Sequence, residues 1–249
     1  MARTPDGGQE SRRQQGEVQS NTPPKTGELA TRLATIYEPL AAAAEAYRTL
    51  RTNLIYSLVD VPPKVIVITS PGPKEGKSTT CANLGVVLAQ AGKTVLIVDC
   101  DFRKPIMHKF FGLRNLQGMV DVLVEERSLQ EVTKEPIEGL TVVPVGRIPP
   151  NPTELLGNQR FANFLTSVRR EFDYVLIDAP PVGLVSDPAI LATQGDGVLL
   201  VLDAQTTRKS SVRQAMRSLD TIGANVLGTV LNNVKALNGD YYRYEYKYG

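Results

Sequence analysis

Residues 70–79 combine the residue types that bind the phosphates of a nucleotide. The segment reads Ser-Pro-Gly-Pro-Lys-Glu-Gly-Lys-Ser-Thr, and its end matches the P-loop pattern, whereas Pro71 stands where the first glycine would be. In a P-loop, successive backbone N–H groups surround the phosphates, the lysine contacts the outer phosphates and the serine hydroxyl binds magnesium. We therefore predict that ATP and Mg²⁺ bind here. The predicted nucleotide contacts are Gly72, Pro73, Lys74, Glu75, Gly76, Lys77, Ser78 and Thr79.

Carboxylates follow two of the apolar runs downstream of this loop. Asp99 and Asp101 come after the run 94–98 and, being two residues apart on an extended chain, point the same way. Two like charges on one side are unfavourable unless a cation lies between them, and magnesium supplies that cation. Asp178 ends another apolar run, as the acidic residue of a Walker B sequence does. We predict Ser78, Asp99 and Asp178 as metal ligands.

The Asp99 and Asp101 pair leaves two questions open at this point. Either carboxylate is a candidate for the base that accepts the proton of a substrate hydroxyl. In the alternative interpretation, Asp101 merely caps the next helix while Asp99 is solvated. The P-loop upstream favours the catalytic interpretation, because the loop and the carboxylates occur in the order expected of a nucleotide site.

Short β-branched runs recur along the chain and predict the strands of one sheet. Most are separated by stretches long enough for crossover helices, so we expect an α/β fold with a doubly wound, mostly parallel sheet. Such sheets place ligands at the carboxyl ends of their strands, where the lysine and the aspartates would meet. Asn232, at the end of the last run, is a candidate adenine contact. The predicted strands are 65–69, 94–98, 140–145, 174–177, 197–202 and 226–231, and the Ala-rich stretch 38–58 predicts a helix before them.

The length and composition suit one substantial domain with flexible ends. The chain has 249 residues with 42% hydrophobic content, which is enough for a single α/β core. We expect residues 1–36 to be disordered, because they begin with a stretch rich in Gln, Gly, Pro and charge. We expect residues 37–236 to form the nucleotide-binding domain and residues 237–249 to be a tail outside the fold.

Several classes of function are disfavoured by composition. A net charge of +2 gives no electrostatic case for nucleic acid as a partner. The chain has two cysteines, too few for a disulfide framework, which fits a reducing cytoplasm. It has one histidine, and its cysteines and histidine lack zinc spacing, which argues against a zinc site and a histidine-based triad. The longest apolar runs are far shorter than the roughly 20 residues of a membrane helix, so we expect any membrane association to come through a partner.

The motifs resemble those of the bacterial tyrosine kinases (BY-kinases) of capsule and exopolysaccharide synthesis, over residues 37–249. The family's Walker A′ motif, Asp-x-Asp-x-Arg, matches Asp99, Asp101 and Arg103, which implies catalytic roles for these residues together with Lys77 and Asp178. The resemblance also implies a P-loop fold of the MinD/ParA-like type with a deviant Walker A motif.

The ending of the chain is rich in tyrosine. Residues 241–249 hold five of the nine tyrosines, and in the resembling family such a cluster is the autophosphorylation substrate. Taken alone, the pattern also suits an amphipathic edge strand or a solvated tail. From residue 238 an extended tail reaches about 40 Å, which favours transfer to a neighbouring subunit. The implied acceptors are Tyr241, Tyr242, Tyr244, Tyr246 and Tyr248.

Glu45, Arg48 and Arg51 are spaced three apart on the predicted N-terminal helix. Taken alone, this is an ordinary solvated face, since exposed ion pairs contribute little stability. The spacing also matches the Glu-x-x-Arg-x-x-Arg motif that joins subunits into rings in the resembling family. That family further implies a separate transmembrane adaptor that recruits the protein to the inner face of the plasma membrane, other tyrosine substrates and a cognate phosphatase.

Two other functions are compatible with the nucleotide motifs. A partitioning or positioning ATPase would use the same Lys77, Asp99 and Asp178, with an incidental tail. Such ATPases carry a signature lysine early in the P-loop, and Gly72 occupies that position here, with Lys74 displaced by two. A regulatory module without catalysis would need defective Walker carboxylates, and none is missing. We therefore predict a protein tyrosine kinase.

Overall fold

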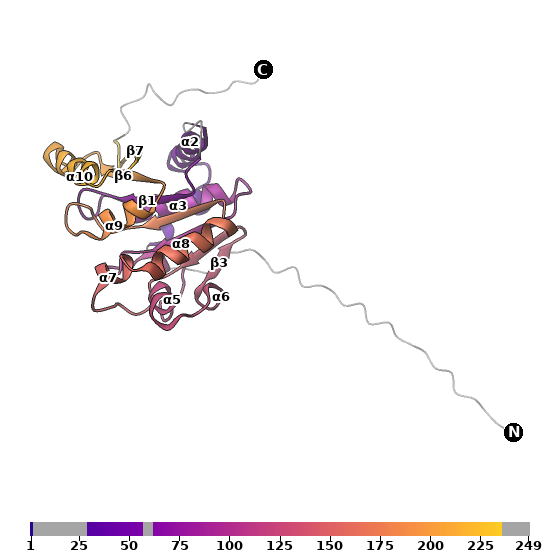
Figure 1. The fold of residues 1–249 in the computed structure, drawn as a ribbon. Helices are drawn as coiled ribbons and strands as arrows, with labels where there is room; N and C mark the ends of the chain where they lie inside the picture. The colour runs from indigo at the N-terminus through magenta and orange to yellow at the C-terminus, as the bar shows by residue number, and fades with distance from the viewer. Residues whose placement is uncertain (2–28, 57–61, 236–249) are drawn as a thin grey trace, which may run out of the picture.

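A computed structural model describes residue 1, residues 29–56 and residues 62–235 (Figure 1). The described part contains a seven-stranded sheet in the order β3-β4-β2-β5-β1-β6-β7. Adjacent strands are parallel except for β3 and β4, which are antiparallel. The predicted doubly wound, mostly parallel sheet is confirmed. The strands are β1 (Val65–Thr69), β2 (Val95–Asp99), β3 (Lys134–Ile137), β4 (Leu140–Val143), β5 (Tyr174–Asp178), β6 (Gly197–Asp203) and β7 (Val226–Asn232).

Helices cover both faces of the sheet and create two hydrophobic cores (Figure 1). Alternate residues of β1 divide between them, with Val65 and Val67 in one core and Ile66 and Ile68 in the other, as the two-residue period of a strand requires. One face carries η1 (Ala30–Arg32), α1 (Ala34–Tyr37), α2 (Ala42–Tyr56), α3 (Lys77–Ala89) and α4 (Met107–Phe110); the other carries α5 (Met119–Glu125), α6 (Leu129–Val132), α7 (Pro152–Leu156), α8 (Gln159–Glu171), α9 (Asp187–Gln194) and α10 (Lys209–Thr221).

The register of the central strands brings the predicted site together. β1, β2 and β5 are buried along their whole length, which explains why each is an unbroken apolar run. Asp99 pairs with Asp178 across β2 and β5, so both carboxylates lie at the same carboxyl edge. β1 lies beside β5, and the P-loop leaves from its end. The three sequence motifs therefore meet at one edge of the sheet.

Helix α3 is held tightly against the sheet behind the P-loop. Most of its residues are buried, and a Cβ added to Gly85 would lie 2.6 Å from Cδ1 of Ile97 in β2. Glycine allows this approach without a shift of the Ile97 side chain. The middle of α3 therefore packs closely on β2, the strand that ends at Asp99.

The structure corrects the predicted start of the domain and adds one strand. Residues 29–36 were expected to be disordered, but Ala30 and Leu33 are buried and Thr35 N–H donates to Asn83 Oδ1 at 3.2 Å. This segment packs on α3, so the ordered domain begins before residue 37. Strand β3 was not predicted, because it is a short edge strand of sequence Lys-Glu-Pro-Ile, which lacks the apolar run of a buried strand.

Two predicted segments fall outside the described residues. These are most of the expected disordered N-terminal segment, residues 2–28, and the tyrosine-rich tail, residues 237–249. Within residues 29–56 and 62–235, no helix has both the length and the apolar character needed to cross a membrane.

Candidate active site

The P-loop follows β1 and turns sharply into α3. Lys74 and Gly76 both have positive φ values, 65° and 96°, a left-handed conformation in which glycine is favoured. A Cβ on Gly76 would lie 2.0 Å from Nδ2 of Asn232, so a side chain at this position would collide with β7. The Asn232 amide donates to the Glu75 carbonyl at 3.1 Å. The predicted nucleotide contact Asn232 therefore lies beside the P-loop.

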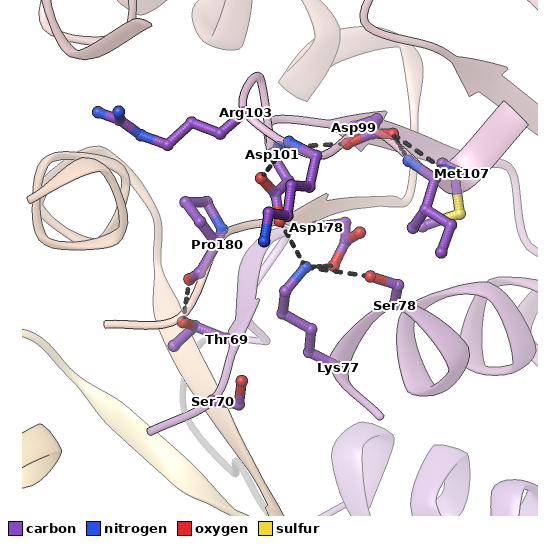
Figure 2. Close-up of polar contacts among 12 residues, drawn as sticks. Thr69, Ser70, Lys77, Ser78, Asp99, Asp101, Arg103, Met107, Asp178 and Pro180 are labelled. Atoms are coloured by element: carbon purple, nitrogen blue, oxygen red, sulfur yellow. Dashed lines mark hydrogen bonds and ion pairs between the residues drawn. The ribbon is translucent and has the colours of Figure 1, made fainter. Parts of the chain in front are cut away.

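Lys77 occupies the centre of a buried polar cluster (Figure 2). Its Nζ lies 3.1 Å from Asp101 Oδ2, 3.3 Å from Asp178 Oδ1 and 3.1 Å from Ser78 Oγ. Burial alone would lower the pKa of Lys77, but the charges of Asp178 and Asp101 outweigh it and raise this pKa. The ammonium is therefore charged, and it balances carboxylates from two different strand ends.

Asp99 is fully buried and bound by backbone groups. Its Oδ1 accepts from the Asp101 N–H at 3.1 Å, and its Oδ2 accepts from the N–H groups of Ile106 and Met107 at 3.1 and 3.0 Å. Burial and the nearby charge of Asp178 raise the pKa of Asp99 to about 8. The alternative of a solvated Asp99 is wrong, and Asp99 rather than Asp101 caps the start of α4.

The donor set at this edge suits a divalent cation with a preference for oxygen. Asp178 Oδ2 is buried and has no hydrogen-bond partner among the described residues, which is costly for a carboxylate oxygen. Burial raises the pKa of Asp178, although a hydrogen bond from the Ser78 hydroxyl to the same carboxylate acts in the opposite direction. Carboxylate and hydroxyl oxygens at one strand edge are ligands that Mg²⁺ accepts. Ser78 and Asp178 therefore fit a metal, with Asp99 adjacent to Asp178 in register.

Arg103 does not join this cluster. Its Nε donates to Asp187 Oδ2 at 3.0 Å and its Nη2 to Thr153 Oγ1 at 3.3 Å, so its side chain points away from Lys77 (Figure 2). Asp187 is fully buried at the start of α9, which makes the ion pair structurally important. The sequence did not point to Thr153 or Asp187 as partners of Arg103. Asp187 stands directly before a proline, a pattern that indicates the start of a helix and not an ion pair with a distant arginine.

The three residues of the predicted oligomerisation motif, Glu45, Arg48 and Arg51, do not all lie on the same side of α2. Arg48 Nη1 pairs with Glu45 Oε2 at 3.0 Å on the exposed side of α2, and Arg48 Nη2 donates to the Pro39 carbonyl at 2.8 Å. Arg51 instead donates to the Val87 carbonyl of α3 at 3.0 Å. Within one subunit, Arg51 therefore links α2 to α3, and Glu45 and Arg48 remain at the surface.

Cys81 and Cys100 flank the site without taking part in it. Both thiols are free and fully buried. Burial, followed by the charges of Asp178 and Asp99, raises the pKa of each thiol well above its usual value. Neither cysteine is therefore a nucleophile or half of a disulfide.

Comparison with known proteins identifies the family. A model of the AAA domain matches residues 63–232. Tyrosine-protein kinase YwqD of Bacillus subtilis (strain 168) is 39% identical over 208 residues, which cover 83% of this chain and 88% of YwqD. The chain belongs to the bacterial tyrosine kinases of the capsule and exopolysaccharide type. The kinase is also 38% identical to tyrosine-protein kinase CpsD of Streptococcus agalactiae, over 80% of this chain and 89% of CpsD.

Solved structures agree with this assignment. The kinase domain of Escherichia coli tyrosine kinase ETK matches the kinase with a TM-score of 0.79 and 31% identity, over 86% of this chain and 84% of that domain. The septum site-determining protein MinD of Pyrococcus horikoshii OT3 has a TM-score of 0.58 and 24% identity, over 68% and 69% of the two chains. The second likeness shows a shared fold alone. The predicted family, the MinD-like P-loop fold and the tyrosine kinase activity are thus confirmed.

Proposed function

We propose that the kinase transfers the γ-phosphoryl group of ATP, bound with Mg²⁺, to tyrosines of its own C-terminal tail in a neighbouring copy. The observation that carries this proposal is the meeting of Lys77, Ser78 and the three aspartates at the carboxyl edge of β1, β2 and β5. Phosphoryl transfer needs little more from a protein than positioning and charge stabilisation, and this cluster provides charged groups in a buried setting.

Each member of the cluster has a distinct proposed role. Lys77 would stabilise charge on the outer phosphates, while Ser78 and Asp178 would hold the metal. When bound, Mg²⁺ neutralises charge that develops on the phosphate oxygens. Asp101 is better suited than Asp99 to accept the tyrosine proton, because the oxygens of Asp99 accept three backbone N–H groups, whereas Asp101 accepts one, from Lys104, and its other oxygen faces Lys77.

The transfer is tested with labelled ATP and two complementary variants. Changing the five tail tyrosines to phenylalanine should abolish self-labelling, because it removes the acceptors but leaves the site intact. Lys77→Met should not label itself, yet it should be labelled when mixed with the tyrosine-free variant, whose active site is unaltered. Label in the mixture demonstrates transfer between subunits.

Two results would contradict this assignment. Undiminished label on the tyrosine-free variant would place the acceptor elsewhere in the chain. Release of phosphate without any protein labelling would favour the partitioning ATPase that shares the fold.

The assembly of subunits is proposed to depend on the outer part of α2. Glu45 and Arg48 are exposed over 66% and 30% of their side chains, so their ion pair is accessible to another copy, whereas Arg51 is engaged with α3. We expect Arg48→Glu to convert a ring into monomers, as measured by light scattering after gel filtration. Arg51 is excluded from this test because its replacement would also disturb the α2–α3 contact.

A matched control separates this effect from a general loss of surface charge pairs. Arg127 forms an exposed ion pair with Glu125, at 2.9 Å, outside α2. Arg127→Glu should therefore leave the mass of the assembly unchanged. A ring that survives Arg48→Glu would rule out α2 as the contact, and equal dissociation by both variants would point to charge alone.

Recruitment and pathway complete the proposal. We propose that a separate transmembrane adaptor brings the kinase to the inner face of the plasma membrane, and that tail phosphorylation regulates polymer synthesis or export. Membership of the capsule and exopolysaccharide kinases supports this.

Phosphorylation of the tail should also loosen the ring. Each phosphotyrosine adds roughly −1.5 to −2 charges, so a phosphorylated tail would be repelled by the aspartates of a neighbouring site.

A further inference from the structure

The Glu75 side chain is a buried carboxylate of the P-loop that the phosphoryl transfer chemistry does not use. It is only 6% exposed. Its Oε1 accepts a hydrogen bond from the Thr207 hydroxyl at 2.9 Å, and its Oε2 is buried without a partner among the described residues. The Gly72 N–H is the other donor to this carboxylate. Burying a carboxylate with so few donors is costly, so the loss of the Thr207 hydrogen bond should be felt strongly.

The contact from Thr207 is fixed in direction. The Thr207 hydroxyl oxygen accepts from the Asp203 N–H at 2.8 Å. Its single proton is therefore free to point at Glu75, which makes Thr207 the donor and Glu75 the acceptor. Thr207 lies in the loop between β6 and α10, 132 residues away from Glu75 in the sequence. The side chain thus connects the P-loop to a distant part of the chain.

The loop that carries Thr207 is itself braced. Asp203 Oδ1 accepts from the N–H groups of Gln205 and Thr206 at 2.8 and 2.9 Å. Asp203 Oδ2 accepts from the Asn233 amide at 3.1 Å, which links this loop to the end of β7. Thr207 is therefore presented to Glu75 from a turn closed by its own hydrogen bonds, and not from a freely moving segment.

The backbone carbonyl of Glu75 is held from the end of β7, next to the loop that carries Thr207. The Asn232 amide donates to the Glu75 carbonyl at 3.1 Å. In a trans peptide the carbonyl and the next N–H point in opposite directions. The bond therefore aims the Gly76 N–H away from Asn232 and β7. A P-loop binds phosphate through backbone N–H groups that are aimed in advance, so the orientation of this peptide matters for affinity.

We propose that Glu75 is a positioning residue that clamps the P-loop to the loops following β6 and β7, and that nucleotide affinity depends on this clamp. Thr207 holds the side chain and Asn232 holds the carbonyl. The inference rests on the proposed binding of ATP by the P-loop. It assigns to Thr207, which carries no nucleotide motif, a part in setting the geometry of the phosphate site.

Direct binding of a fluorescent ATP analogue with Mg²⁺ to the full-length kinase tests the clamp without relying on activity. Thr207→Val keeps the shape of the side chain but removes its donor to Glu75 and its acceptor for the Asp203 N–H, and we expect the Kd to rise about five- to tenfold, since bonds to charged groups are among the stronger ones. Thr207→Ser restores the hydroxyl and should bind within about twofold of the wild type. Thr229→Val makes the same chemical change at an exposed position of β7 and should have no effect.

A double-mutant cycle identifies Glu75 as the partner. Glu75→Met removes the acceptor of the Thr207 hydroxyl, so Thr207→Val should raise the Kd of that variant by much less than it raises the Kd of the wild type. Additive effects of the two changes, or a Thr207→Val protein that binds as tightly as the wild type, would overturn the clamp. A wild-type kinase that does not bind the analogue would overturn the proposed function and the clamp with it. Equal kcat values with a raised KM in Thr207→Val would agree with a role in binding.

Discussion

Lys77→Met is expected to reduce tyrosine phosphorylation by at least about a hundredfold, the effect typical of removing a preorganised charge-stabilising group. Lys77 is the cation between Asp101 and Asp178, at 3.1 and 3.3 Å. Its loss removes the proposed contact with the outer phosphates and leaves the carboxylates without their internal counterion. Self-labelling with ATP measures the first effect, and thermal unfolding of the nucleotide-free protein measures the second.

Two further variants make this result specific. Lys77→Arg keeps the positive charge, but a planar guanidinium does not replace a compact ammonium in this narrow setting, so activity should remain low. Lys134→Met removes a lysine from the exposed edge strand β3 and should leave activity unchanged. Activity of Lys77→Met within about tenfold of the wild type would exclude the lysine from the central role assigned to it.

The second large effect is a loss of stability as the pH rises. The pKa of Asp99 is raised to about 8 in the folded protein, whereas an aspartate in an unfolded chain titrates near about 4. Between these values the unfolded chain has released a proton that the folded protein retains, so rising pH favours unfolding. From about pH 6.5 to 8 the free energy of unfolding of the nucleotide-free kinase should fall by about 2 kcal/mol.

Other groups also contribute to the slope in this pH range. Burial raises the pKa of Asp178 as well, so Asp178 acts in the same direction as Asp99. His108 has a pKa lowered by burial, and a histidine of the unfolded chain loses its proton near about pH 6.5, so His108 slightly opposes the slope at the acid end of the range. Asp173 and Asp196 have lowered pKa values and are ionised in both states throughout this range. Chemical denaturation at several pH values measures the slope.

Removing or neutralising the Asp99 carboxylate should reduce the slope. Asp99→Asn has no proton to release at this position and should give a clearly shallower profile than the wild type. Saturating Mg²⁺ and ATP should have a similar effect on the wild type, because a bound cation favours the ionised carboxylate. A wild-type stability that is constant or rises from pH 6.5 to 8 would contradict the assignment to Asp99.

Much of the fold was predictable because its signals are local. The buried central strands are unbroken apolar runs, and β1 and β5 were predicted within one residue of their observed ends. The P-loop and the aspartates were located by strand ends, and the pairing of Asp99 with Asp178 then follows from a parallel sheet. The roles of these residues in binding and transfer stay predictions, although their meeting in space is observed.

What the sequence did not reveal depends on contacts between distant segments. Arg103 and Asp187 are 84 residues apart, and neither has a local pattern that indicates the other. Arg51 could not be separated from Glu45 and Arg48 by spacing alone, because its partner is a carbonyl of α3. The order of residues 29–36 likewise comes from packing against α3, which outweighs a composition typical of flexible chains.

The burial of both native thiols has a practical consequence for experiments on assembly. Cys81 and Cys100 are inaccessible and poorly ionised, so maleimide dyes should not react with them in the folded kinase. A single introduced cysteine, for example in place of Tyr56, which is 76% exposed at the end of α2, would take up one fluorophore selectively. Energy transfer between copies labelled with different dyes would then report how fast subunits exchange, with the native cysteines left in place.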